Sequence, residues 1–85
     1  MVINIAMPTV FILLGFRFYF FSNDHTPIHI HISKGGSEAK FNVVPDVLLI
    51  NNQGFKNAEL KIIKTIIEEN KEVIIEHWIT YFNKK

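Results

Sequence analysis

The fold is decided by residues 28–43, which read IHIHISKGGSEAKFNV. In the first part isoleucine alternates with histidine, and alternate residues of a β-strand point to opposite faces of a sheet. Gly35 and Gly36 supply the positive φ angles that a two-residue turn needs. The stretch therefore predicts a β-hairpin whose strands cover residues 28–33 and 37–43.

Counting outward from the turn gives the register of this hairpin, with His31 opposite Lys40 and Ile30 opposite Phe41. The face predicted to enter the core then holds Ile28, Ile30, Ile32, Ala39, Phe41 and Val43. The other face holds His29, His31, Ser33, Glu38, Lys40 and Asn42. A shift by one residue would mix the two sets, so the pattern favours this register.

Two strands are predicted before the hairpin, at residues 9–14 and 16–22, because both segments are rich in aromatic and aliphatic residues and Gly15 separates them. Residues 23–27 are turn-forming. If this turn joins neighbouring strands, the chain order places three more side chains on the histidine face, those of Arg17, Tyr19 and Phe21.

The second half of the chain predicts a short strand at residues 47–50, a loop at residues 51–54 and then helix. We expect Asn57 to cap a first helix and Asn70 to begin a second that runs to about Phe82. The predicted class is α+β: an antiparallel sheet of four or five strands, connected as hairpins or a meander, followed by two C-terminal helices packed on one face.

The composition of the chain excludes several kinds of site and several classes of protein. The chain of 85 residues fits one domain, and it lacks cysteine, which excludes disulfides, thiolate ligands and a cysteine nucleophile and agrees with a cytoplasmic location. The net charge of +1 does not indicate a nucleic-acid binder, although a local basic patch stays open. Residues 2–21 are apolar but broken by Pro8, Gly15 and Arg17, so we predict strands there and no membrane segment.

Partners are expected from the apolar content of 48%, which includes eight phenylalanines. So much apolar surface in a small domain suggests that a second copy or another protein covers part of it. We therefore expect a homo-oligomer or a complex with another protein.

Several separate blocks of residues occur in order along the chain from Met7: MPTV at 7–10, GFRF at 15–18, SNDH at 22–25, Pro27, HIH at 29–31, EAKF at 38–41 and the late Trp78. Together they resemble the bacterial family called domain of unknown function 4160. The resemblance implies a small prokaryotic protein, often encoded beside another short protein in a layout similar to toxin–antitoxin pairs, and it supplies no established activity. Because the family usually begins at the Met-Pro pair, residues 1–6 are expected to be an extension without a role and residues 7–85 the domain.

The leading functional hypothesis is an interaction or regulatory protein of such a two-gene module, with a divalent metal such as Zn²⁺ on the histidine strand. The Cα atoms of His29 and His31 would lie about 6.6 Å apart, and their rings could converge on one ion. His25 is the predicted third ligand, and Asp24 or Glu38 a further ligand or an orienting group. Three protein ligands and a water form the open arrangement that hydrolysis uses.

Two alternatives remain open from sequence. In the first, the protein is a hydrolase, most plausibly a nuclease, that uses the histidine face with or without a metal ion. In the metal-free form Arg17 and Lys40 would attract a phosphate, Tyr19 would stack or donate, and His29 or His31 would transfer protons. In the other alternative the histidines simply keep one face of the sheet polar. The sequence alone does not decide whether the protein is an enzyme.

Overall fold

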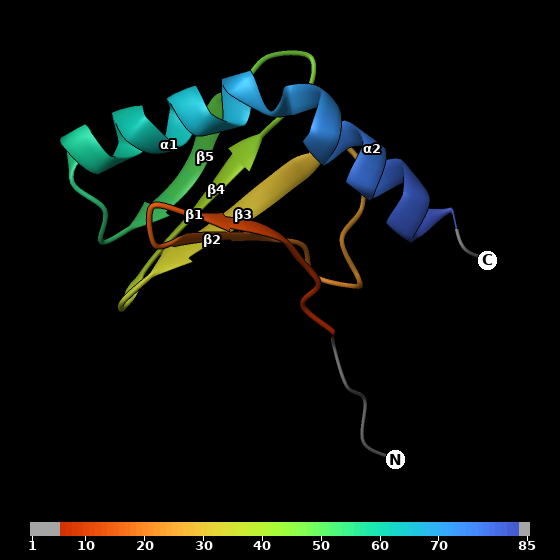
Figure 1. Cartoon of the computed structure of the whole chain (residues 1–85), viewed down its shortest axis with the longest axis horizontal. Helices are drawn as coiled ribbons and strands as arrows, with labels where there is room; N and C mark the ends of the chain where they lie inside the picture. The colour runs from red at the N-terminus through yellow and green to blue at the C-terminus, as the bar shows by residue number, and fades with distance from the viewer. Residues whose placement is uncertain (1–5, 84–85) are drawn as a thin grey trace.

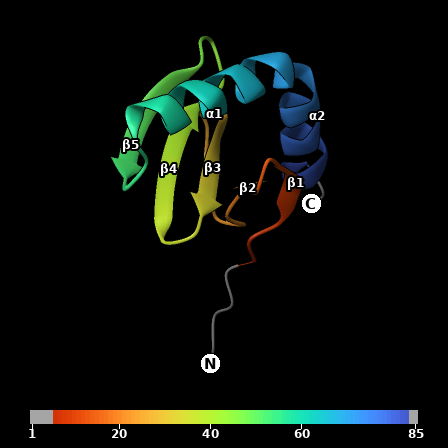
Figure 2. The same ribbon diagram turned by 60° about the vertical axis from the view of Figure 1, so that its left-hand side comes forward.

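A sheet of five antiparallel strands frames the protein, of which the computed structural model describes residues 6–83. The strands lie in chain order: β1 (Thr9–Leu13), β2 (Phe16–Tyr19), β3 (His29–Lys34), β4 (Ser37–Asn42) and β5 (Leu48–Gln53). Two helices follow, α1 (Asn57–Glu69) and α2 (Lys71–Phe82), and they arch over one face of the sheet (Figures 1 and 2). The predicted α+β class, with two C-terminal helices, is confirmed.

The central hairpin has the predicted register. His31 pairs with Lys40 and Ile30 with Phe41 across β3 and β4. The register between β2 and β3 is also confirmed, since Tyr19 pairs with His31. Alternation along β2, β3 and β4 therefore divides this part of the sheet into an apolar face under the helices and a polar open face.

The core forms between the apolar face of the sheet and the inner faces of both helices. Its fully buried residues come from β2 to β4, from the residues that directly follow β2 and β4, and from the helices. They include Phe18, Phe20, Ile30, Ile32, Phe41, Val43, Ile63, Ile67 and Ile74. Trp78 of α2 packs its ring 5.2 Å from that of Phe20 and 4.3 Å from that of Phe82. These contacts place α2 against the segment that leaves β2, next to the start of β3.

Two local predictions were wrong. Residues 51–53 were expected in a loop, but they continue β5, where Asn51 pairs with Lys40 and Gln53 with Glu38. Backbone pairing with β4 outweighs the low strand propensity of these polar residues. Asn57 is the first residue of α1 and not its cap; Lys56 occupies the cap position, and its amide donates to the Glu59 carboxylate at 3.0 Å. The predicted start of α2 is correct, because Asn70 stands at its cap position.

Both edge strands of the sheet carry a bulge. Strand β1 contains a bulge between Thr9 and Phe11, and β5 one opposite Lys40 and Phe41. Apart from Ala6, whose amide and carbonyl bond to Ser22, the expected extension at residues 1–6 lies outside the described residues. Within residues 6–83 neither helix is long and apolar enough to cross a membrane.

Candidate metal centre

The loop between β2 and β3 brings Asp24 to the first residues of β3. The turn is closed in both directions, because the Phe21 amide donates to Asp24 Oδ2 at 2.8 Å and the Asp24 amide donates to the Phe21 carbonyl at 3.0 Å. Aspartate favours such turns because its side chain bonds to nearby backbone. The result is a carboxylate whose side chain is only 10% exposed, fixed in position before any ligand binds.

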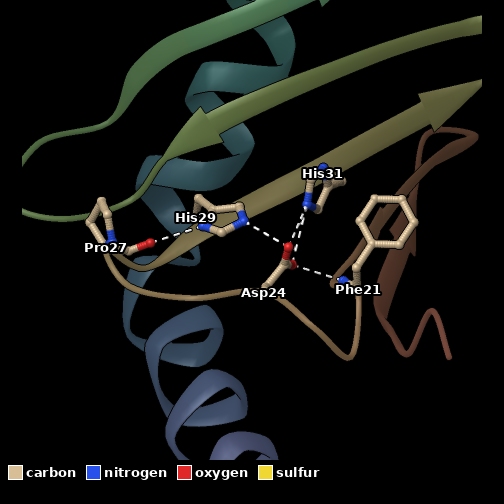
Figure 3. A network of polar contacts seen from close by, with 5 residues as sticks. All are labelled: Phe21, Asp24, Pro27, His29 and His31. Carbon is tan, nitrogen blue, oxygen red and sulfur yellow. Dashed lines mark hydrogen bonds and ion pairs between the residues drawn. The ribbon is translucent and has the colours of Figure 1, made fainter. Parts of the chain in front are cut away.

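His29 and His31 project from β3 towards this carboxylate (Figure 3). His29 Nε2 lies 3.0 Å from Asp24 Oδ1, and His31 Nε2 lies 3.2 Å from Oδ2. Asp24, His29 and His31 each offer one ligand atom, and these three atoms all lie within 4.8 Å of one another. Ligand atoms bound tetrahedrally to Zn²⁺ at about 2.0–2.1 Å are about 3.3 Å apart, so the observed separations are close to those of a metal site.

The protons of His29 make this contact unusual. Its Nδ1 lies 2.9 Å from the Pro27 carbonyl oxygen, which can only accept, so Nδ1 carries the proton. In the neutral ring Nε2 is then an acceptor, and it faces an acceptor oxygen of Asp24. Nε2 is buried, and Oδ1 lies too far off its hydrogen-bonding direction to be a partner despite the 3.0 Å separation. The lone pair of Nε2 is therefore left free beside a carboxylate.

Only a positive charge relieves this arrangement: a second proton on His29 or a cation between the two groups. The bond from Nδ1 to a backbone carbonyl is the contact that metal-bound histidines commonly make, since it fixes the ring and exposes the other nitrogen.

Electrostatics keep the group in its ligand form. Burial acts to raise the pKa of Asp24, but the hydrogen bond from the Phe21 amide and the two nearby histidines outweigh it and lower that pKa below its usual value. Burial lowers the pKa of His31, with Asp24 opposing and Lys40 adding to the effect. Near neutral pH the carboxylate is thus ionised and His31 is neutral, which are the forms that bind metals.

Helix α2 closes the site on one side. The Trp78 ring lies 5.2 Å from the His29 ring, and His29 is 5% exposed as a result of this packing and of the loop. His31 is more open and lies 4.5 Å from the Phe21 ring and 5.5 Å from the Tyr19 ring. The group therefore has a closed end at His29 and an accessible end at His31.

The other residues predicted for this face lie on the open side of the sheet. Tyr19, His31 and Lys40 occupy one row across β2, β3 and β4. Burial and the nearby Glu38 raise the pKa of Tyr19, so its hydroxyl stays protonated. Arg17 points towards β1, where its Nε donates to Thr9 Oγ1 at 2.8 Å and its guanidinium lies 4.5 Å from the centre of the Tyr19 ring.

The predicted ligand set and the observed group overlap without being identical. Asp24, His29 and His31 come together, whereas His25 is exposed and lies outside the group. Glu38 is also outside it, exposed on β4 opposite Gln53. The group thus contains the two strand histidines and Asp24, which the sequence suggested as a further ligand or an orienting group, and it does not contain His25.

The family assignment follows from a match between residues 15–79 and the family described as a domain of unknown function. The chain belongs to the DUF4160 family. The resemblance noted from the sequence is thereby confirmed, and the matched segment includes the whole Asp24–His29–His31 group and Trp78. No curated protein and no solved structure matches this DUF4160 chain.

Two backbone groups and one side chain of the site were not predicted from sequence. They are the Phe21 amide, the Pro27 carbonyl and the Trp78 ring. The turn-forming residues 23–27 signalled that local bonds would form, but not which acceptor would meet which donor. The contact with Trp78 depends on how α2 packs, and no local pattern carries that information.

Proposed function

We propose that this DUF4160 protein binds a divalent transition-metal ion, Zn²⁺ in the first instance, through Asp24, His29 and His31. The observation that carries the proposal is the buried Nε2 of His29, which has no hydrogen-bond partner and lies 3.0 Å from a carboxylate oxygen of Asp24. Two histidines and one carboxylate are a ligand set that occurs in catalytic zinc and non-haem iron sites. Such a set leaves at least one coordination position for water or another ligand.

The test is metal uptake by protein that has been purified without a histidine tag. Trp78 is the only tryptophan of the chain and lies 5.2 Å from His29, so its fluorescence should change when Co²⁺ or Zn²⁺ binds. Elemental analysis should give about one ion per chain. Asp24→Asn, His29→Gln and His31→Gln should each abolish the fluorescence response.

His25→Ala and His77→Ala are the matched controls, because both histidines are exposed and lie outside the group. Each control removes an imidazole and should bind metal like the wild type. A wild type that takes up no ion from Zn²⁺, Co²⁺, Ni²⁺, Mn²⁺ or Fe²⁺ would overturn the proposal. Equal loss in the controls would show non-specific binding to surface histidines.

We propose further that the protein acts in the cytoplasm as the interaction or regulatory member of a two-gene, toxin–antitoxin-like module, bound to the small protein encoded beside it. The family resemblance supports this, and so does apolar surface that lies outside the core. Leu13, Leu14 and Ile62 lie together around one surface hollow, where they are 43%, 66% and 44% exposed. A monomeric protein rarely leaves such residues grouped on its surface.

Co-expression with the neighbouring gene product tests this second proposal. An affinity tag on the neighbouring protein should capture this chain as well, and the two proteins should elute together in size-exclusion chromatography. Leu14→Asp should abolish the complex. The variant Glu76→Gln, at an exposed position on α2, serves as the control. Separate elution of the two wild-type proteins at micromolar concentration would contradict it.

A further inference from the structure

A groove on the open face of the sheet begins at the metal group. It has a volume of about 200 Å³ and is lined by Tyr19, Phe21, His31, Lys40, Asn51 and Gln53, with Glu38 beside them. Pockets that hold drug-sized molecules have about 300–1,000 Å³, so the groove suits a smaller ligand or one nucleotide of a larger one. His31 belongs both to the groove and to the metal group, and therefore joins them.

The polar side chains of the groove are free to bind a ligand. Among residues 6–83, Lys40 Nζ has no hydrogen bond and no ion pair, and the same holds for the side-chain amides of Asn51 and Gln53. Lys40 is only partly exposed, so its charge acts at close range on whatever enters. These groups offer three hydrogen-bonding side chains on one small surface.

The charges are ordered along the groove. In the row across the strands, His31 lies between Tyr19 and Lys40, and Lys40 pairs with Asn51. Glu38 and Gln53 occupy the next row, two residues along each strand, or about 6.6 Å away. With an ion bound at the metal group, the end at His31 and Lys40 is therefore cationic and the far end is acidic, without an ion pair between Lys40 and Glu38 to cancel them.

This order selects a ligand that has an oxyanion at one end and a hydrogen-bond donor at the other. Lysine and a metal ion both bind phosphate oxygens. Glutamate accepts hydrogen bonds from the exocyclic amine of a base, and asparagine and glutamine bind the edges of bases.

We infer that the groove binds a nucleotide whose base carries an exocyclic amine, with the phosphate at Lys40 and the metal centre and the base at Glu38, Asn51 and Gln53. The inference rests on the proposed metal site for one of its two phosphate contacts. The contacts to the base and to Lys40 come from the sheet alone. A net charge of +1 fits this assignment, because one local cation and one ion suffice for a single phosphate.

Cytidine 5′-monophosphate and uridine 5′-monophosphate are the probes, since only cytosine carries the exocyclic amine that Glu38 would recognise. Binding is measured by NMR titration and calorimetry on the full chain, metal-free and loaded with Zn²⁺. We expect the cytidine nucleotide to bind at least about tenfold more tightly than the uridine nucleotide. Glu38→Gln should remove that preference, because a glutamine side chain can hydrogen-bond to either base.

Lys40→Gln should weaken both nucleotides by about tenfold and leave their ratio unchanged, since Lys40 contacts the phosphate. Lys61→Gln is the matched control: it removes the same charge from α1, on the opposite face of the sheet, and should change nothing. Circular dichroism verifies that each variant is folded, and neither Glu38 nor Lys40 belongs to the core.

The outcomes separate the two proposals. Metal uptake without nucleotide binding at 10 mM, or binding with no preference between the two bases, would overturn the groove assignment and leave the metal site. Nucleotide binding that depends on Lys40 and Glu38 in a protein that takes up no metal would overturn the metal site and leave the groove assignment. If Lys61→Gln weakens binding as much as Lys40→Gln, the attraction is general and the assignment is wrong.

Discussion

Replacing Asp24 with asparagine separates the two explanations for its close contact with His29. The amide oxygen can take the place of Oδ2 and still accept from the Phe21 amide at 2.8 Å. The amide nitrogen then takes the place of Oδ1, 3.0 Å from His29 Nε2, and donates to the free lone pair. The contact between two acceptors thus becomes a hydrogen bond, whereas the hydrogen bond from the Phe21 amide loses the negative charge of its acceptor.

The energies of these two changes are similar and opposite. A neutral hydrogen bond contributes about 0.5–1.5 kcal/mol, and the bond from Phe21 loses a comparable amount when its acceptor loses its charge. For metal-free protein at about pH 8 we therefore expect Asp24→Asn to change the free energy of unfolding by less than about 1 kcal/mol. A buried ion pair between protonated His29 and Asp24 would instead cost about 3–5 kcal/mol when broken.

In the presence of zinc, the wild type and Asp24→Asn should differ clearly in stability. At a Zn²⁺ concentration 100 times Kd the wild type gains about 2.7 kcal/mol, which raises Tm by about 11–22 °C in a domain of this size. If the variant binds about 100-fold more weakly, it gains about 0.4 kcal/mol under the same conditions. Asp24→Asn should thus be nearly as stable as the wild type without metal and much less stable with it.

Urea unfolding and thermal denaturation of tag-free protein, first in EDTA and then in Zn²⁺, measure both quantities. His77→Ala is the control, because it removes an exposed histidine on α2 and should respond to zinc like the wild type. The reasoning is refuted if metal-free Asp24→Asn loses about 3 kcal/mol or more, since His29 would then carry the second proton. It is also refuted if the variant and the wild type gain equally from zinc.

Three further predictions concern single residues. Burial lowers the pKa of His31 from 6.5, so the unfolded chain binds a proton more readily than the folded chain does. The free energy of unfolding of metal-free protein should therefore fall as pH drops below about 6.5. Urea titrations at several pH values should show that this free energy depends less steeply on pH in His31→Gln. Gly54→Ala should lower stability by about 1–3 kcal/mol in thermal denaturation, because φ is +108° and the new Cβ would lie 2.7 Å from Ser37 Oγ. Gly36→Ala is the control and should lower stability less, because nothing lies within 4 Å of its added Cβ. A larger loss in Gly36→Ala would contradict this expectation. Leu14→Asn should raise Tm, by an amount equivalent to about 0.5–1 kcal/mol, because Leu14 has φ of +54° and asparagine adopts that conformation more easily; a lower Tm would show that exposed Leu14 makes a stabilising contact.

The sheet was predictable because its information is local. Alternation fixes which face each residue of β3 and β4 occupies, and the glycine pair fixes where the strands reverse, so the pairing of His31 with Lys40 follows by counting. The strand assignment failed at residues 51–53 because β5 extends wherever β4 offers partners. That pairing lies outside the segment itself, and polar residues at an exposed edge give no sign of it.

The site was predictable in part for the same reason. The common face of His29 and His31 follows from their spacing, whereas the choice of Asp24 over His25 depends on a turn in which one side chain points inward and its neighbour outward. Both residues are plausible ligands by type. Only the hydrogen bond from the Phe21 amide selects between them, and that bond exists only once the loop has folded.

The division of the sheet into two faces has a practical consequence for engineering. Side chains on the open face alternate with core residues along β3 and β4, and Gln53 lies on β5, whose residues are all exposed, so positions such as Ser33, Glu38, Lys40 and Gln53 can be randomised together without altering the packing beneath the helices. A combinatorial library at these positions would sample new ligand chemistries on an unchanged scaffold. Its folded fraction would depend mainly on β-sheet propensity, since none of these side chains fills interior volume.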